Sequence, residues 1–479
     1  MEGKNVNKKG LILFVTAIAF SVSQLSKVDG AVALNSFVKN CNFSKNDAGE
    51  PLFLTKYIES GDIDKARVLS KTGCLPSAPQ VLSYSGFITV NKEFNSNIFF
   101  WFFPAMNNNK NAPVLLWLQG GPGVSGFFGL FVENGPYVID ANMTASIRKY
   151  NWARTYQIIF VDNPVGTGFS FTDDPKGYVT NQEEMAEDMY KFLKQFFVLF
   201  PEYQKNDFYI AGESYAGKYI PSLAYKIHSM GSQSAVKLTG IAIGNGMCDP
   251  ETMMDYGTYL YNIGLVDEMQ ADEMRNLSSS IVRHIQKEDF YDAVLEMDKL
   301  IISFAILPYK SLFTIFTGMN FYYNFLISET PKEFSYFQTY VEKPQFRNAL
   351  HIGNLTFQNG ETVQKYLLMD VMKSVKPKVA VIMDHYRVMI YNGQLDIIIP
   401  YPATLNFLKS VNWTHAAEYK KAKRHIWRLK GSNEIAGYVH NVGDFYEVLV
   451  RKVGHILPYD NPEVGFDLIT RFIDKVPFW

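Results

Sequence analysis

The sequence predicts an α/β fold with a mostly parallel central sheet. Short continuous apolar runs, each ending in turn residues, are typical of strands that are buried on both faces. Helical stretches separate these runs, and this alternation predicts a sheet covered by helices. The chain has 479 residues, which would allow two or three domains. We expect one α/β domain over residues 31–479 that carries an insertion.

The expected strands begin with an antiparallel pair, 84–91 and 98–103, which alternates around an Asn/Ser/Asn turn. Buried strands then follow at intervals, and 445–453 is the last of the series. Helical patterns cover Glu183–Phe200 and Pro221–Met230. The buried strands between the pair and the last strand are Val114–Leu118, Ile158–Val161, Phe208–Ala211, Leu238–Ile243 and Val388–Tyr391.

The alternation of buried strands and helices stops over residues 249–377. This stretch is helical in pattern and rich in aromatic residues, most densely between Phe313 and Phe325. It predicts a helical cap inserted into the α/β domain. Most of its aromatic side chains are expected to pack inside the cap, and some are expected to face a cleft.

The N-terminus resembles a targeting segment. Lys4, Lys8 and Lys9 precede an uncharged apolar run over 11–22, and small and polar residues follow to Gly30. The run is shorter than the roughly 20 residues that span a bilayer. A signal peptide of about residues 1–30 is therefore expected, which predicts a secreted or endolysosomal protein without a transmembrane anchor. Candidate glycosylation sequons begin at Asn42, Asn142, Asn276, Asn354 and Asn412.

Composition excludes several classes of function. The net charge is −1 and 47% of residues are hydrophobic, so neither nucleic acid nor an anionic membrane is an expected partner. Three cysteines are too few for a disulfide framework, and pairing of Cys41 with Cys74 is one option that leaves Cys248 free. No metal-ligand motif occurs and the run 120–123 lacks the ending of a phosphate loop, so neither a metal nor a cofactor is expected. A monomer and a homodimer both stay open.

Ser214 is the candidate nucleophile. The apolar run that begins at Phe208 breaks into small residues around this serine and resumes with a helical pattern. On a tight strand-to-helix turn, small neighbours allow the serine Oγ to stand clear of the sheet. The pattern G-x-S-x-G is met except that Ala216 takes the fifth position and Gly217 follows. A plain turn serine is the alternative interpretation.

The serine needs a base within hydrogen-bond reach, and the base needs an acid that holds its tautomer. In an α/β-hydrolase arrangement the acid and then the histidine follow the serine along the chain. Asp396 fits the acid because it lies in the loop after the strand-like 387–391. His455 fits the base because it follows the expected last strand in a small-residue turn. Among the other histidines after Asp396, His425 lies beside the charged run 420–424 in a likely strand, and His415 and His440 lack a preceding strand that would deliver them.

An oxyanion hole requires backbone N–H groups aimed at the carbonyl oxygen on which negative charge develops. The expected strand 114–118 runs into Gln119-Gly-Gly-Pro-Gly123, where glycines allow a substrate close to the backbone. The N–H groups of Gly121 and Tyr215 are the candidate donors. A simple tight turn is the alternative for this glycine-rich run.

With these parts assembled, the chain resembles the serine carboxypeptidase family, and specifically its vitellogenic carboxypeptidase-like branch, from about Tyr84 to the C-terminus. The resemblance implies an α/β-hydrolase fold with a helical cap and removal of C-terminal residues from peptides through an acyl-enzyme. It also implies that Ser214, Asp396 and His455 are nucleophile, orienting acid and base. The motifs that carry it are 117–123, 133–137, 212–217, 391–396 and 454–462.

The resemblance further implies a device that binds the substrate's free carboxylate. It consists of the side chains of Gln119, Glu133 and Glu213 and the backbone of Gly120. Carboxyl groups gathered closely cannot all stay ionised, so one is expected to hold a proton and donate it to the peptide's carboxylate. Loss of that proton at higher pH would weaken peptide binding, which predicts acidic operation. Gln119 stands where the family usually has asparagine.

Three classes of function fit these residues. The first is a serine carboxypeptidase acting on peptides with a free C-terminus. The second is an acyltransferase or esterase on the same triad, and the third is a non-catalytic binding or stabilising protein of the same fold. A complete set of catalytic parts favours the first. Spacing does not assign the preferred C-terminal residue, although Tyr215 is expected near its pocket.

Overall fold

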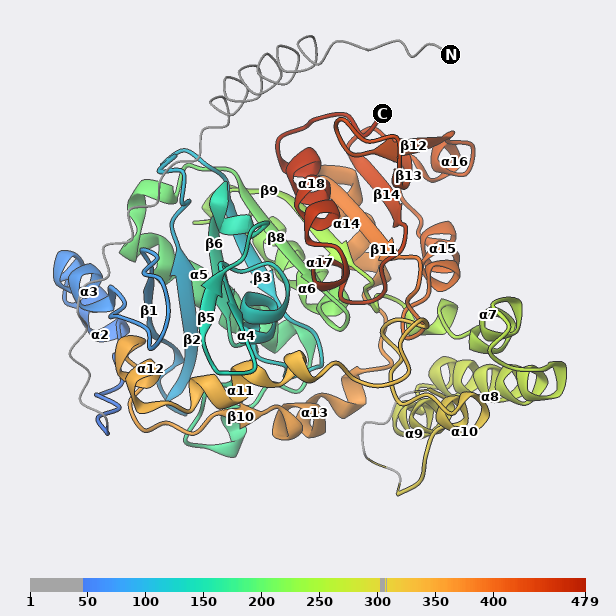
Figure 1. Ribbon diagram of the computed structural model, residues 1–479, viewed down its shortest axis with the longest axis horizontal. Helices are drawn as coiled ribbons and strands as arrows, with labels where there is room; N and C mark the ends of the chain where they lie inside the picture. Colours follow the sequence, from blue (N-terminus) through green and yellow to red (C-terminus); the bar gives the residue numbers. More distant parts are fainter. Residues whose placement is uncertain (1–45, 302–305, 307) are drawn as a thin grey trace, which may run out of the picture. The chain divides into compact units, whose positions relative to one another are not determined.

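The computed structural model describes residues 46–301, 306 and 308–479. The predicted signal peptide, Cys41 and Asn42 lie outside these residues. Within them a ten-stranded sheet runs in the order β1-β2-β6-β3-β8-β9-β11-β14-β13-β12 (Figure 1). The six strands from β6 to β14 pair in parallel, and two antiparallel strands flank them at each edge. The predicted α/β fold with a mostly parallel sheet is confirmed.

The bounds of the strands in the large sheet follow the apolar runs closely. The edge strand β12 contains His425, where a strand was expected, but its neighbour β13 was not among the expected strands, because Gly437, His440 and Asn441 interrupt its apolar pattern. The ten strands are β1 Tyr84–Asn91, β2 Ser96–Phe103, β3 Val114–Leu118, β6 Gln157–Val161, β8 Phe208–Glu213, β9 Leu238–Gly244, β11 Arg387–Gly393, β12 Arg424–Arg428, β13 Ile435–Val442 and β14 Phe445–Val450.

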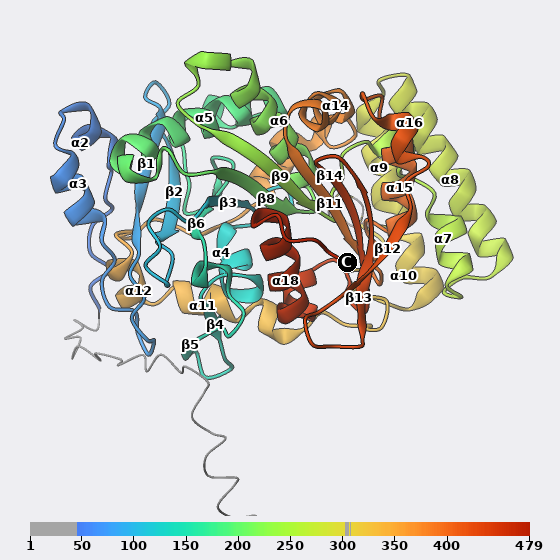
Figure 2. The same cartoon turned by 90° about the horizontal axis from the view of Figure 1, so that it is seen from above.

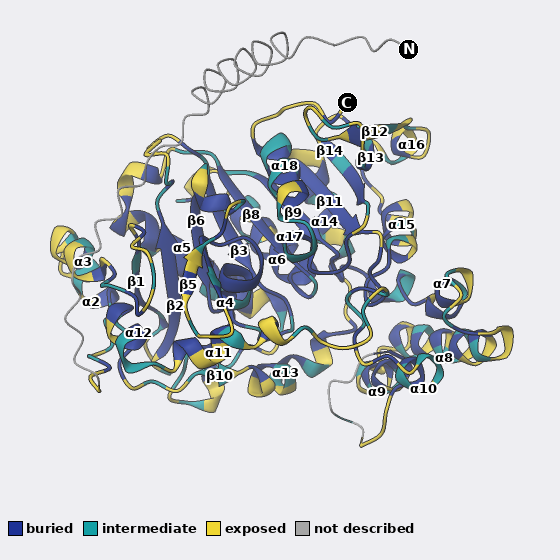
Figure 3. Cartoon of the chain, viewed as in Figure 1, coloured by how far each residue is buried: buried dark blue, intermediate teal, exposed yellow. Residues whose placement is uncertain are grey.

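Successive side chains of the central strands enter two separate hydrophobic cores. Leu116 and Ile210 belong to the core on one face, and their neighbours Leu115 and Tyr209 belong to the core on the other. Figure 2 shows α5, α6 and α14 along the first face, and α4 and α18 along the second. Because helices cover both faces, the central strands β3, β6, β8 and β11 are buried throughout, in agreement with the colouring of Figure 3.

Eight helices of the described chain surround the sheet. Helix α6 begins at Ala216, five residues before the start expected from the sequence, and carries Pro221 inside it. The eight are α2 Thr55–Glu59, α3 Ile63–Ser70, α4 Gly126–Phe128, α5 Gln182–Leu199, α6 Ala216–Ser229, α14 Lys376–His385, α15 Tyr401–Ser410 and α18 Pro462–Ile473; two further short helices, α16 Ala416–Tyr419 and α17 Leu457–Asp460, lie near β13 and α18.

The insertion between β9 and β11 contributes no strand to the large sheet in the residues described. It is not wholly helical, however, because its short strand β10 (Gln358–Asn359) pairs with β7 (Thr167–Gly168). The boundaries of a cap at 249–377 stay a prediction. Its helices are α7 Tyr256–Asn262, α8 Glu268–Gln286, α9 Phe290–Leu300, α10 Leu312–Thr317, α11 Tyr336–Val341, α12 Pro344–Ala349 and α13 Glu361–Leu367. A small hairpin of β4 (Tyr137–Ile139) and β5 (Ala145–Ile147) lies elsewhere in the chain.

Surface features bear on the expected compartment. Four sequon asparagines lie in the described part of the chain, and all four are exposed: Asn142, Asn276, Asn354 and Asn412. Cys74 is disulfide-bonded, whereas Cys248 is a buried free thiol. None of the described helices has the length and apolarity needed to cross a membrane.

Candidate active site

Ser214 occupies a strained turn between β8 and α6. Its φ of 62° lies in the left-handed region, which costs a non-glycine residue energy unless the surroundings hold it. Three backbone hydrogen bonds do so. The Ser214 N–H donates to Gly244 O at 3.0 Å, and the Ser214 carbonyl accepts from Gly217 N–H at 2.9 Å and Met247 N–H at 3.0 Å. The serine is thus presented at the carboxyl end of the sheet.

Glycines around this turn are required by close backbone approach. A Cβ on Gly120 would lie 2.6 Å from Ser214 Cβ and 2.8 Å from Tyr215 N. A Cβ on Gly212 would lie 2.1 Å from the carbonyl oxygen of Leu118. The loop after β3 therefore packs directly against the serine turn. This contact puts the two regions that hold the predicted oxyanion donors, Gly121 and Tyr215, beside each other.

Asp396 and His455 are joined by a hydrogen bond. The His455 Nδ1 lies 2.7 Å from Asp396 Oδ2, and both side chains are buried. The other carboxylate oxygen of Asp396 accepts backbone N–H groups from Ile398 at 2.9 Å and Ile399 at 3.3 Å. These bonds fix the carboxylate, and the carboxylate in turn orients the imidazole so that Nδ1 carries its proton.

The opposite nitrogen of the imidazole is free to act. His455 Nε2 is buried and has no hydrogen-bond partner among the described residues. The ring stacks on Tyr323, with centroids 4.7 Å apart and planes inclined by 20°, and the His455 N–H donates to the Tyr323 carbonyl at 2.6 Å. A segment of the insertion therefore holds the ring from the side.

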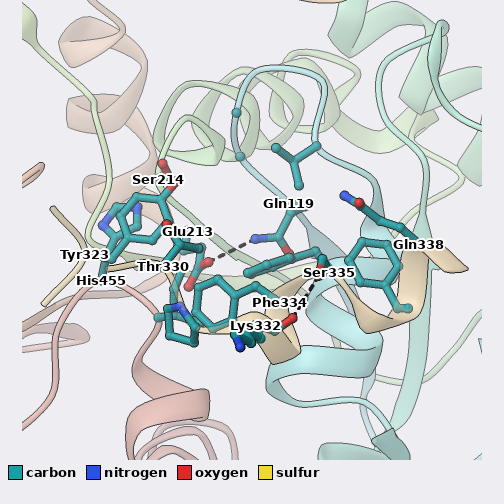
Figure 4. Close-up of a pocket in the computed structure, with 17 residues that line it drawn as sticks. Gln119, Glu213, Ser214, Tyr323, Thr330, Lys332, Phe334, Ser335, Gln338 and His455 are labelled. Atoms are coloured by element: carbon teal, nitrogen blue, oxygen red, sulfur yellow. Dashed lines mark hydrogen bonds between the residues drawn. The ribbon is translucent and has the colours of Figure 1, made fainter. Parts of the chain in front are cut away.

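A cavity of about 430 Å³ connects these residues. Ser214 and His455 line it, together with Gln119, Gly121 and Glu213 (Figure 4). Two of the three predicted triad side chains thus share one cavity, and the third, Asp396, lies behind His455. The triad roles themselves stay a prediction.

Two of the three predicted carboxylate-binding side chains, Gln119 and Glu213, line the cavity, whereas Glu133 is fully buried and is not part of the lining. Gln119 Nε2 donates to Glu213 Oε1 at 2.9 Å (dashed in Figure 4), while Gln119 Oε1 accepts from the Trp117 indole at 2.8 Å. Because the indole can only donate, the amide orientation is fixed with its NH₂ toward the acid. Gly120 also lines the cavity.

Burial strongly disfavours ionisation of the two acids. It raises the pKa of Glu133 to about 7, against a smaller lowering effect of the neighbouring Glu213 and Gln119, and neither Glu133 carboxyl oxygen has a hydrogen-bond partner among the described residues. Burial also holds the pKa of Glu213 well above its usual range, and the nearby Glu133 adds to this effect. At mildly acidic pH the pair therefore retains at least one proton, which is what donation to a carboxylate requires.

Residues 75–475 match the model of the serine carboxypeptidase family. The chain belongs to this family. It is 49% identical over 433 residues to the human probable serine carboxypeptidase CPVL, covering 90% of each chain. It is 45% identical to the venom serine carboxypeptidase of Apis mellifera (91% of this chain and 93% of the relative) and 43% identical to the vitellogenic carboxypeptidase of Aedes aegypti (90% and 91%).

The solved structure of Kex1(delta)p, a prohormone-processing carboxypeptidase from Saccharomyces cerevisiae, superposes with a TM-score of 0.74 at 20% identity, covering 85% of this chain and 96% of that one. This likeness confirms the fold. The family match and the relatives confirm the predicted vitellogenic carboxypeptidase-like resemblance and make the protein a serine-type carboxypeptidase, a hydrolase.

Sequence reasoning missed two residues of this serine carboxypeptidase's site. Asn245, directly after β9, donates to Asp396 Oδ2 at 2.6 Å. Its place after a buried strand was a usable signal. Arg148 is buried and donates to the carbonyls of Phe131 and Gly135, on either side of Glu133, at 2.5 and 3.1 Å. No local pattern marks Arg148, because its partners are backbone atoms brought near by folding.

One rejected histidine is placed differently from the expectation. His440 lies within β13 instead of lacking a strand, and its Nδ1 is 2.9 Å from Glu447. His425 lies within β12 and stacks on Trp479, and His415 lies next to Glu418. None of the three lines the cavity at Ser214.

Proposed function

We propose that Ser214, His455 and Asp396 are the nucleophile, base and orienting acid of this carboxypeptidase. The observation that carries the proposal is the His455–Asp396 hydrogen bond of 2.7 Å beside a cavity that Ser214 also lines. The strained serine turn and the unpartnered His455 Nε2 support it. This arrangement suits a serine whose proton passes to an imidazole.

The reaction proceeds in two halves. His455 Nε2 takes the Ser214 proton as Oγ attacks the last peptide carbonyl, and the oxyanion accepts hydrogen bonds from the N–H groups of Gly121 and Tyr215. His455 then protonates the leaving amine, which departs as the C-terminal amino acid. Water, deprotonated by His455, hydrolyses the acyl-enzyme and releases the shortened peptide.

Recognition of a free C-terminus rests on Gln119, Gly120, Glu133 and Glu213. The protonated acid pair donates to the substrate carboxylate, and the backbone of Gly120 adds a further contact. Binding of this kind favours acidic operation, because ionisation of both acids would repel the peptide's carboxylate. A secreted or endolysosomal location fits this preference, and the four exposed sequon asparagines support passage through the secretory pathway.

The test uses Ser214→Ala and a pair of peptides that differ only in a free or amidated C-terminus. The variant is expected to lose several orders of magnitude in kcat while its melting temperature changes little. The wild-type protein is expected to bind a fluorophosphonate at Ser214 and to cleave the free acid far better than the amide. Equal cleavage of acid and amide would instead support an esterase or acyltransferase. If the fluorophosphonate does not label Ser214, this residue is not the nucleophile.

A further inference from the structure

The cavity beside Ser214 extends into a chamber formed by the insertion. Residues 330–338 supply seven of the residues that line it, including Lys332, Phe334 and Gln338. In the view of Figure 4, Gln119 and Glu213 are seen between Ser214 and Phe334. A peptide whose carboxylate is bound at Gln119 and Glu213 therefore has its last side chain on the side of the insertion.

The wall of this chamber is aromatic and firmly held. Phe128 and Phe334 meet edge to face with centroids 5.2 Å apart, and Phe337 lies 6.3 Å from Phe128. Phe334 is further buttressed by Tyr459 at 4.8 Å. Such a wall accepts the hydrocarbon part of a long side chain and directs its end outward, since an apolar surface offers no partner for a polar group.

The charge at the outer end of the wall is positive. Among the described residues that line the cavity, Lys332 carries the one fixed cation and Glu213 is the one carboxyl. Glu213 is buried and hydrogen-bonded to Gln119, whereas Lys332 is exposed at the rim beside Phe334. A C-terminal side chain that passes the aromatic wall thus meets a positive charge, and the one carboxyl of the lining, Glu213, is buried and bonded to Gln119.

We propose that Lys332 is a specificity-determining residue of this site. Its charge disfavours peptides with a basic C-terminal residue, whereas large apolar or acidic C-terminal residues are accepted. This inference rests on the proposed exopeptidase reaction. A lysine or arginine bound in this chamber would place a second cation near Lys332, whereas a glutamate would gain an attraction. Because the rim is exposed, salt screens both effects.

The experiment compares three peptides that are identical except for a C-terminal leucine, glutamate or lysine. It measures kcat/KM at pH 6, where the C-terminal glutamate and lysine side chains of the peptides are both charged. The proteins are wild type, Lys332→Glu and the control Lys409→Glu. Lys409 is an exposed lysine of α15 outside the cavity, so its reversal changes net charge equally. A second peptide set varies only the penultimate residue.

For wild type we expect the leucine and glutamate peptides to be cleaved faster than the lysine peptide. Lys332→Glu should move the glutamate-to-lysine ratio by about tenfold or more toward lysine, since two charges about 4 Å apart in water interact by about 1 kcal/mol, roughly fivefold, and the reversal changes this interaction for both peptides. This shift should shrink at high salt, and Lys409→Glu should leave the ratio unchanged.

Two results would overturn the inference while sparing the proposed function. One is wild-type cleavage of the lysine peptide as fast as the glutamate peptide. The other is a Lys332→Glu shift that equals the Lys409→Glu shift or appears only in the penultimate set. Failure of all three peptides with wild type would overturn the proposed exopeptidase reaction and this inference with it.

Discussion

The ammonium nitrogen of Lys218 lies 2.9 Å from Oδ2 of Asp370, and both side chains are buried. Lys218 belongs to α6, four residues after the candidate nucleophile, and Asp370 belongs to the insertion. The same carboxylate oxygen accepts from the Tyr215 hydroxyl at 3.0 Å and the Gln182 amide at 2.7 Å. The insertion is thus tied by one carboxylate to the helix that follows Ser214.

Removing one partner of this pair should destabilise the protein strongly. Lys218→Met leaves Asp370 buried without its cation, and such changes cost about 3–5 kcal/mol of unfolding free energy. The double variant Lys218→Met/Asp370→Leu should recover much of this loss, because no buried charge remains. Urea denaturation measures both. A double variant no more stable than Lys218→Met would show that the pair is not the source of the effect.

Gly120→Ala should abolish most activity. The new Cβ would collide with the backbone nitrogen of Tyr215 and with Ser214 Cβ, so the serine turn must move. Displacement of about 1 Å at a reacting group costs on the order of 100-fold in rate. Fluorophosphonate labelling and kcat measure the loss. Gly465→Ala in α18 is the matched control, since its nearest contact is the end of the Leu457 side chain at 3.1 Å; it should keep full activity.

Asn245→Gly should lower kcat more than it raises KM. It removes the hydrogen bond to Asp396, and a hydrogen bond to a charged group contributes about 1.5–3 kcal/mol, equivalent to roughly 10- to 150-fold. Glycine is chosen because Asn245 has a φ of 42°, which glycine adopts without strain. Steady-state kinetics on a free-acid peptide measures the effect. A rise confined to KM would place Asn245 in substrate binding instead.

Peptide affinity should fall as pH rises through about 7. Below that pH Glu133 holds a proton, and above it Glu133 ionises beside Glu213, whose pKa burial also raises; Gln119, Arg148 and His455 are the other groups that face Glu133. We expect KM for a free-acid peptide to increase between pH 5 and 8, while KM for its amide stays constant. Glu133→Gln, which cannot ionise, should flatten the profile. A KM for the free acid that does not change over this range contradicts the proposed role.

Stability should also fall as pH rises from about 4 to 7. Burial raises the pKa of Glu133 to about 7 and that of Asp162 to about 6, so the folded state binds more protons than the unfolded state in this interval. The unfolding free energy therefore decreases with pH through both values. Thermal unfolding at pH 5 and pH 7.5 checks the sign. Asp162→Asn should reduce the difference, and a higher melting temperature at pH 7.5 would contradict it.

Much of the fold was readable from local pattern. Each central strand is an apolar run buried on both faces, so its position did not depend on knowing its neighbours. The strand β13 was missed for the opposite reason, since a glycine and polar residues interrupt its apolar pattern and only half of its residues are buried. The last strand was expected over 445–453, which is three residues too long, because β14 ends at Val450.

The site divides in the same way. Ser214, Asp396 and His455 could be proposed as a triad because each follows a strand whose carboxyl end meets the others at one edge of a parallel sheet. Asn245 follows such a strand as well, but a lone asparagine is too common in turns to be singled out. Arg148 and Lys218 could not be found, since a buried charge takes its meaning from partners distant in the chain.

The order of apolar runs, turn residues and small residues determined the fold class, the position of the candidate nucleophile and the chain order of its partners, because these depend on periodicity and on backbone sterics within a few residues. Tertiary structure alone decided the distances, the burial and the charge environment. It placed Glu133 beside Glu213, Asn245 against Asp396, and Lys332 at the rim of the cavity. Solvation and electrostatics act through space, so sequence separation carries little information about them.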